Sequence, residues 1–227
     1  MKFEDRVPFM VRLDAEDRQA LFESGTPLTF AARQVLMQEH EPSAHALILL
    51  SGWTKVTSAA ANGYEALLAL RGPGDIVGEG AVLSGRPRGA TVTALKRVEA
   101  LAIDAGRFSR LLEERPGISR KLLALTADRM RDSDRRRVQY AALNVQERLA
   151  LLLLELMGSH GEDTENGVQL TPGLTQSELA GSVGASREAV ARLLKGLRDR
   201  GIVRTGRRGL VVVRPEVLRR MAGQEYR

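Results

Sequence analysis

The most informative segment of this chain is Gly78-Glu79-Gly80-Ala81-Val82-Leu83-Ser84-Gly85-Arg86-Pro87-Arg88-Gly89-Ala90-Thr91-Val92. It follows the turn residues Gly72-Pro73-Gly74-Asp75 and ends in a segment typical of the start of a strand. Glycines let the backbone approach a ligand, Arg88 offers a fixed cationic fork, and Glu79 offers an acceptor for a hydroxyl. These residue types in this order predict a pocket for a sugar-phosphate.

Short strand-like segments surround this stretch on both sides. Turn signals separate them, and Asn62-Gly63 between apolar runs is a strong hairpin signal. Many short strands with such punctuation predict a β-barrel or sandwich. The expected strands are Gln34–Met37, Ala46–Leu50, Trp53–Ser58, Ala66–Leu70, Ile76–Val77, Ala90–Ala94 and Val98–Ile103.

Helical patterns lie outside this block of strands. One short helix is expected over residues 15–23, and another over Asp104–Arg115 that ends at Pro116. A long helix should then run from near Gly117 to about Ala142. Its seam at a spacing of about 3.5 residues is narrow and partly polar, so we expect it to pack against the barrel and against a second copy of itself. The alternative is a single amphipathic helix that covers only its own domain. The seam consists of Leu122, Thr126, Arg129, Ser133, Arg136 and Tyr140.

The C-terminal third carries a second motif. Asn144 begins a leucine-rich helix with a capping-box pattern, a polar loop is expected over Ser159–Asn166, and a short strand over Val168–Leu170. Thr175-Gln176-Ser177-Glu178 is another capping box, Gly184 suits a left-handed turn, and Ser186 can cap the next helix. Two short helices joined by a glycine turn are the helix-turn-helix pattern, with Ala180, Val183, Val190 and Leu193 expected to pack the pair. The hairpin Val203–Val213 that follows, with a basic tip, is typical of a wing.

Composition narrows the function classes. The net charge is +6, and residues 187–220 hold eleven Lys and Arg against three acidic residues, as a nucleic-acid surface requires. The sequence has no cysteine, which excludes disulfides, thiolate metal sites and iron–sulfur clusters. Its three histidines, His40, His45 and His160, are too scattered to predict a metal site or haem.

The N-terminus lacks the apolar region of a signal peptide, and no apolar run is long enough to cross a membrane. We therefore expect a cytoplasmic protein with no membrane partner.

An enzyme is not expected. Gly72-Pro73-Gly74 with Gly78 superficially resembles a dinucleotide fingerprint, but the spacing fails and no strand–helix–strand unit follows. The sequence contains no Walker motif, no metal cluster and no Ser-His-Asp pattern that would predict catalytic residues.

Both motifs together resemble the transcription regulators of the CRP/FNR family, across nearly the whole chain. Gly78-Glu79 and Pro87-Arg88-Gly89-Ala90-Thr91-Val92 are similar to that family's cyclic-nucleotide cassette, and Thr175–Ala180 with Gly184–Arg192 to its DNA-reading segment. The resemblance implies an α+β fold, with a cyclic-nucleotide-binding β-roll (jelly-roll) over 1–116. A long dimerisation helix and hinge would occupy 117–143, and a winged helix-turn-helix 144–227.

The resemblance also implies a set of ligand-binding residues. Arg88 would pair with the cyclic phosphate, Glu79 would accept from the ribose 2′-hydroxyl, and Gly78, Gly89 and Ala90 would line the phosphate with backbone. Arg129 is expected either to pair with Glu79 or to face solvent. Ser133 and Asp134 fall where the family's receptor contacts the base, with Asp134 reaching in from the partner subunit. Gly89 and Asp134 depart from the family pattern, because many bacterial members have hydroxyl residues at both positions.

Similar reasoning gives the DNA-binding residues. Arg187 and Arg192 would donate to guanine, and Glu188 would accept from cytosine. Arg207 and Arg208 at the tip of the wing are expected to contact phosphate. The remaining members of the DNA-reading set are Thr175, Gln176 and Ser186.

The predicted function is therefore a homodimeric, DNA-binding transcription regulator controlled allosterically by a cyclic nucleotide. cAMP is the first candidate and cGMP the next. The alternative is a regulator of the same fold that is ligand-independent or binds a different effector, such as cGMP or a cyclic dinucleotide. The expected partners are palindromic DNA with TGTGA-like half-sites, a second copy of the chain, and RNA polymerase. No metal, haem or iron–sulfur cluster is expected.

Overall fold

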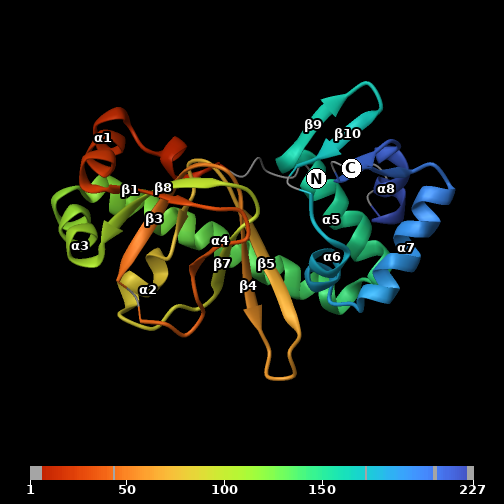
Figure 1. Cartoon of the computed structure of the whole chain (residues 1–227), viewed down its shortest axis with the longest axis horizontal. Coiled ribbons are helices and arrows are strands. Elements are labelled where there is room, and N and C mark those ends of the chain that lie inside the picture. The colour runs from red at the N-terminus through yellow and green to blue at the C-terminus, as the bar shows by residue number, and fades with distance from the viewer. Residues whose placement is uncertain (1–6, 43, 172, 207–208, 224–227) are drawn as a thin grey trace. The chain divides into compact units, whose positions relative to one another are not determined.

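The computed structural model describes residues 7–42, 44–171, 173–206 and 209–223. They form two compact units, one of Val7–Asp132 and one that begins at Ser133 (Figure 1). We call them the N-terminal and the C-terminal unit. The units divide between Asp132 and Ser133, which is within the long helix. The domain boundaries predicted at residues 116 and 143 lie at the two ends of that helix and stay a prediction.

The N-terminal unit is built on two four-stranded sheets, with strand orders β1-β8-β3-β6 and β2-β7-β4-β5. Helices flank the strands in sequence at both ends, and the β4–β5 hairpin extends beyond the rest of its sheet (Figure 1). The elements are η1 (Phe9–Arg12), α1 (Ala15–Ser24), β1 (Thr26–Phe30), β2 (Val35–Met37), β3 (His45–Ser51), β4 (Thr54–Ala59), β5 (Glu65–Arg71), β6 (Ile76–Val77), α2 (Glu79–Ser84), β7 (Thr91–Ala94), β8 (Val98–Asp104), α3 (Ala105–Glu114) and α4 (Pro116–Ala142).

Strand β3 shows how the core is divided. Its side chains alternate, so that Leu47 and Leu49 pack between the two sheets while Ala46 and Ile48 pack under the helices. Both faces of the strand are therefore buried, which explains its unbroken apolar run. The cluster under the helices includes residues of α1, α3 and α4, among them Leu21, Phe108 and Ile118.

Helix α4 packs on its own unit through Ile118, Leu122 and Leu125, which are all buried. The seam expected for a second copy began at Leu122, and that residue belongs to this internal core instead. Within the N-terminal unit, the exposed apolar side chains of α4 lie one position further on: Leu123 is 71% exposed and Met130 is 67% exposed. Because the two are seven residues apart, they lie on one face of the helix.

The C-terminal unit contains a helix-turn-helix and a four-stranded sheet of order β11-β12-β10-β9. Its remaining elements are α5 (Val145–His160), β9 (Gly161–Thr164), β10 (Gly167–Leu170), α6 (Gln176–Val183), α7 (Arg187–Asp199), β11 (Val203–Gly206), β12 (Gly209–Val212) and α8 (Pro215–Met221). The loop expected over Ser159–Asn166 is wrong. Helix α5 continues to His160, and β9 pairs with β10 because Thr164 and Gly167 close a tight hairpin. Of the four residues expected to pack α6 against α7, Ala180, Val183 and Val190 are buried, whereas Leu193 is only half-buried and its neighbour Leu194 is buried.

Candidate functional site

The stretch Gly78–Val92 forms a turn, one short helix and an extended return. Gly78 precedes α2 with φ of +79°, and Gly85 follows α2 with φ of +65°; both values are in the left-handed region that favours glycine. A Cβ on Gly78 would lie 2.5 Å from Nη1 of Arg88. Gly78 is therefore required twice, by its backbone conformation and by the side chain packed against it.

This stretch forms one wall of a cavity of about 370 Å³ in the N-terminal unit. The cavity brings together most of the residues predicted to bind the effector. Those that line it are Gly78, Glu79, Arg88, Gly89, Ala90 and Arg129. The described lining does not include Ser133 and Asp134, whose side chains are exposed on α4.

Arg88 lies beneath the cassette and is only 4% exposed. Its Nη1 donates to the carbonyl of Gly78 at 2.8 Å, and its Nη2 donates to the carbonyl of His45 at 2.6 Å. Burial lowers the pKa of the guanidinium, whereas the nearby charge of Glu79 raises it. The side chain thus joins strand β3 to the turn before α2.

Glu79 begins α2 and contacts the long helix. Nη1 of Arg129 lies 2.5 Å from Oε1 of Glu79, and Nη2 of Arg129 donates to the carbonyl of Ile76 at 2.8 Å. Both side chains are largely shielded from solvent. Arg129 was expected either to pair with Glu79 or to face solvent, and in the structure it pairs with Glu79. Through it, the cassette is bonded directly to α4.

Two further arginines line the cavity, and sequence analysis missed both of them: Arg71 at the end of β5 and Arg86 within the cassette. Together with Arg88 and Arg129 they place four guanidinium groups around one carboxylate, Glu79. This balance suits an anionic ligand. Arg86 lay inside the quoted stretch, so its charge was a signal that was available. The described residues contain no group of acidic, His and Cys side chains that could hold a metal ion.

A turn between β2 and β3 supports Arg88 from behind. The amide of His40 donates to the carbonyl of Arg88, and the amide of Arg88 donates to the carbonyl of Glu41, each at 2.8 Å. Glu39 continues this network, because its carboxylate accepts from the hydroxyl of Ser58 at 2.6 Å and from the amide of Ala59 at 3.1 Å. These two bonds lower the pKa of Glu39. The β4–β5 hairpin and the cassette are thereby joined to the same turn.

His40 holds this turn in a conformation that favours glycine, with φ of +70°. Its side chain is 85% exposed. We expect His40→Gly to raise the free energy of unfolding of the N-terminal unit by up to about 1 kcal/mol, because it removes the Cβ crowding while the backbone bonds stay. Urea unfolding measures the change. The control is His40→Ala, which keeps a Cβ; an equal gain from Ala would contradict the explanation.

The helix-turn-helix is defined by its caps. Thr175 accepts from the amide of Glu178 at 3.2 Å, and the Glu178 carboxylate accepts from the amide of Thr175 at 2.8 Å. Gly184 has φ of +63°, and the Ser186 hydroxyl accepts from the amide of Ala189 at 3.2 Å. The hydroxyls of Thr175 and Ser186 therefore cap α6 and α7.

Three side chains predicted to read bases are exposed on α7: Arg187, Glu188 and Arg192. They lie on the first turns of the helix, away from the buried Val190 and Leu194. Gln176 is half-buried at the start of α6. Arg207 and Arg208 lie outside the described residues.

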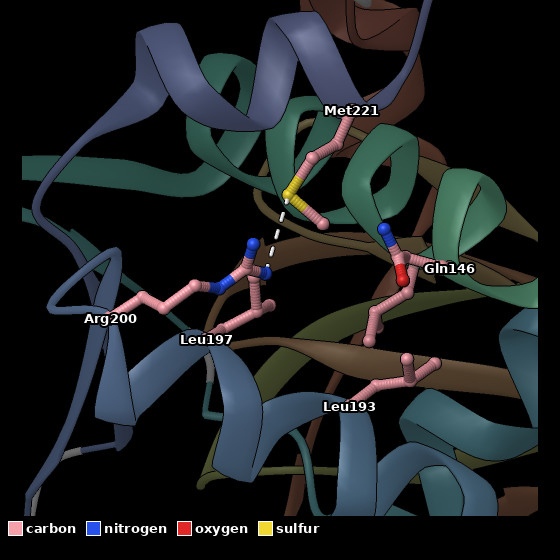
Figure 2. A pocket seen from close by; sticks show the side chains of 6 residues that line it. Gln146, Leu193, Leu197, Arg200 and Met221 are labelled. Atoms are coloured by element: carbon pink, nitrogen blue, oxygen red, sulfur yellow. Dashed lines mark hydrogen bonds between the residues drawn. The ribbon is translucent and has the colours of Figure 1, made fainter.

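The inner side of α7 packs toward α5 and α8 (Figure 2). Leu193 faces Gln146, Leu197 lies near Arg200, and Arg200 reaches the sulfur of Met221 at 3.9 Å (Figure 2). The hollow between them measures about 10 Å³, which is room for about one water molecule. This place is therefore a packing contact and not a ligand pocket.

Family models match both units. Residues 27–115 match the cyclic nucleotide-binding domain, and residues 147–221 match the Crp-like helix-turn-helix domain. A curated relative, the CRP-like cAMP-activated global transcriptional regulator of Mycobacterium tuberculosis, is 32% identical over 203 residues, which cover 89% of this chain and 91% of the relative. The chain belongs to the CRP/FNR family.

Other relatives agree with this assignment. The cyclic AMP receptor protein of Thermus thermophilus is 32% identical over 171 residues, which cover 75% of this chain and 76% of the relative. Among solved structures, a c-di-GMP-responsive global regulator of Xanthomonas campestris has a TM-score of 0.79 at 22% identity and covers 88% of this chain and 99% of its own, which supports the fold.

Family membership confirms several of the predictions. The fold is the expected one of a cyclic-nucleotide-binding domain, a long helix and a helix-turn-helix. The chain is a DNA-binding transcription regulator and not an enzyme. None of the helices that the structure describes is long and apolar enough to span a membrane.

Proposed function

We propose that this CRP/FNR-family regulator acts as a homodimer on palindromic DNA and is controlled by a cyclic nucleotide, with cAMP as the first candidate. The observation that carries the proposal is the cavity in which Glu79, Arg88 and Arg129 meet beside the cassette glycines. Two relatives that are 32% identical are named for cAMP, which supports this choice of effector.

Each residue of the cavity has a role in this proposal. The cyclic phosphate lies over the backbone of Gly78, Gly89 and Ala90 and takes hydrogen bonds from Arg88. Glu79 accepts from the ribose 2′-hydroxyl. Arg88 and Glu79 already have partners within the chain, and in this proposal the ligand competes with those partners for the same two side chains.

The bond between Arg129 and Glu79 provides a route by which ligand binding can affect α4. A ribose hydroxyl on Glu79 changes what Arg129 contacts, and Arg129 is part of α4. The nucleotide shifts the protein toward DNA binding only if it binds the DNA-competent arrangement more tightly than the other. Ser133 and Asp134 follow on the same helix and contact the base, Asp134 from the partner subunit.

The dimer in this proposal forms along the exposed apolar side of α4. Leu123 and Met130 are on it, and Val138, which is 66% exposed, follows on the same helix. Large exposed apolar side chains in a row are unusual on a helix that faces only water, and a second copy of α4 would bury them.

On DNA, α7 enters the major groove. Arg187 and Arg192 donate to guanine, Glu188 accepts from cytosine, and the half-sites are TGTGA-like. Thr175, Gln176 and Ser186 lie at the helix starts that approach the backbone of the DNA. Arg207 and Arg208 contact phosphate from the wing. RNA polymerase is the expected protein partner on the promoter.

A second candidate is the same regulator with a different effector, such as cGMP or a cyclic dinucleotide, or with none. Two observations favour it. Arg88 is buried with both terminal nitrogens on backbone carbonyls, an arrangement that needs no ligand. The four arginines around the cavity also exceed the single charge of one cyclic phosphate.

Calorimetric titration with cAMP, cGMP and cyclic dinucleotides separates these candidates. We expect cAMP to bind, and Glu79→Gln to weaken it by about fivefold, because a charged acceptor becomes a neutral one. The matched test is 2′-deoxy-cAMP: it should bind wild-type protein more weakly than cAMP does, and Glu79→Gln should reduce that difference. An undiminished difference would exclude the role given to Glu79, and no heat with any nucleotide would leave only the ligand-independent form.

A further inference from the structure

The junction between α4 and the helix-turn-helix is held by side chains from both sides. Tyr140, near the end of α4, donates its hydroxyl to the carbonyl of Ser182 near the end of α6. Arg148, in the first turns of α5, donates from Nε to the carbonyl of Val183 at 2.8 Å. The two side chains therefore supply donors to the last carbonyls of α6, which have no partner within that helix.

Arg148 also caps α4. Its Nη1 donates to the carbonyl of Leu143 at 2.6 Å and to the carbonyl of Tyr140 at 3.3 Å. One guanidinium thus satisfies the C-terminal ends of two helices, where a positive charge is also favoured by the helix dipoles. Its carbon lies 5.2 Å from the centre of the Tyr140 ring, within the range of a cation–π contact.

The glycine of the helix-turn-helix completes the contact. A Cβ on Gly184 would lie 2.8 Å from Cε1 of Tyr140, so the ring packs directly against the turn between α6 and α7. The Tyr140 hydroxyl carries the proton that it donates at neutral pH, as tyrosines ordinarily do, and burial raises its pKa further. The last turns of α4 also belong to the same compact unit as α6 and α7, which begins at Ser133.

We propose that Tyr140 and Arg148 are positioning residues that lock the end of α4 to the turn of the helix-turn-helix, so that α7 moves with the last turns of α4 as one body. The hinge expected within 117–143 would then be closed where α4 ends. The proposal rests on the proposed function in one respect, which is that two such units must reach half-sites about one turn of DNA apart.

A rigid joint has a consequence that DNA can measure. If each α7 is fixed to its α4, the distance between the two recognition helices of a dimer is fixed too. Inserting two base pairs between the half-sites moves them apart by about 7 Å and rotates them, so a locked dimer should lose affinity. A joint that has been loosened should tolerate the insertion better.

The first measurement is amide hydrogen exchange of the full-length protein over residues 139–148. The variants are Tyr140→Phe, which removes only the hydroxyl, and Arg148→Lys, which keeps the charge but not the fork. The control is Tyr64→Phe, which removes a tyrosine hydroxyl of similar exposure in the N-terminal unit. We expect exchange over 139–148 to be about two- to tenfold faster in both junction variants and unchanged in the control. Unchanged exchange in the junction variants would overturn the proposal.

The second measurement compares binding to a palindrome, to the same palindrome with two inserted base pairs, and to a single half-site. We expect the junction variants to keep the affinity for the half-site while the penalty for the insertion falls by about two- to tenfold. An unchanged penalty, or an equal loss on the half-site, would contradict a positioning role. If wild-type protein bound no palindrome, the proposed function would fail, and hydrogen exchange would still decide the state of the joint.

Discussion

Arg88→Met should lower the free energy of unfolding of the N-terminal unit by about 2–4 kcal/mol. The reason is that the variant leaves the carbonyls of Gly78 and His45 without their charged donor in a place shielded from water. Nucleotide binding should be lost as well, since this is the proposed phosphate partner. Trp53 is the only tryptophan of the chain and lies in this unit, so its fluorescence during urea unfolding reports the change.

The matched control is Arg86→Met, two residues earlier in the same cassette. Arg86 is exposed, and substitutions of exposed residues usually change stability by less than about 0.5 kcal/mol. Arg88→Lys should lower the free energy of unfolding by an amount between those of Arg86→Met and Arg88→Met, because one ammonium can reach only one of the two carbonyls well. If Arg88→Met unfolded at the same urea concentration as wild-type protein, the side chain would not join β3 to the cassette in the way described.

Arg187→Ala should weaken binding to the preferred DNA by about 1–3 kcal/mol and relax the base preference at one position of each half-site, because the proposed bidentate contact with guanine is lost. Stability should not fall. Arg187 is the first residue of α7, where a positive charge is unfavourable to the helix dipole and Ala is a better helix former. Binding to a set of palindromes with single substitutions measures both effects.

Lys195→Ala is the control for charge. Lys195 is exposed on the same helix and is nearer its C-terminal end. Removing it should lower affinity for all sequences alike and leave base preference unchanged. If Arg187→Ala behaved in the same way, Arg187 would contact phosphate rather than a base edge.

Local signals explain why much of the fold could be predicted. The capping boxes at Asn144 and Thr175, the left-handed Gly184 and the cap at Ser186 each depend on a few neighbouring residues, and each formed as expected. Strand β1 was missed because Pro27 and an exposed pattern hide it at the edge of its sheet. Helix α2 was missed because it is short and has no buried residue, although the glycines at both ends were a signal. Helix α8 was also missed, although Pro215 at its start and basic residues in its last turn marked it.

The site was harder to predict, because its features depend on segments far apart in the sequence. The cassette residues could be named from their order alone. The direction of the Arg88 side chain could not be predicted, because it donates to the carbonyl of His45 on β3, far away in the sequence. Arg71 comes from the end of β5, and only the folded sheet brings it to the cavity. In the N-terminal unit, the exposed apolar side of α4 differs by one position from the expected seam because the core of that unit takes Leu122.

The sheet of the C-terminal unit has a consequence for how such proteins can be assembled. Strand β10 precedes the helix-turn-helix in the sequence and lies between β9 and β12 in the sheet. Segments that come before and after the motif therefore pair in one sheet. Helix α5, which precedes the sheet in the sequence, also packs against α8, the last helix of the unit. Because the first and last helices of the unit are in contact, the unit has the compactness expected of a domain that folds by itself. The unit begins at Ser133 and includes Tyr140, so a transfer between regulators should join the chains at Ser133, where the contacts that hold the helix-turn-helix are carried along.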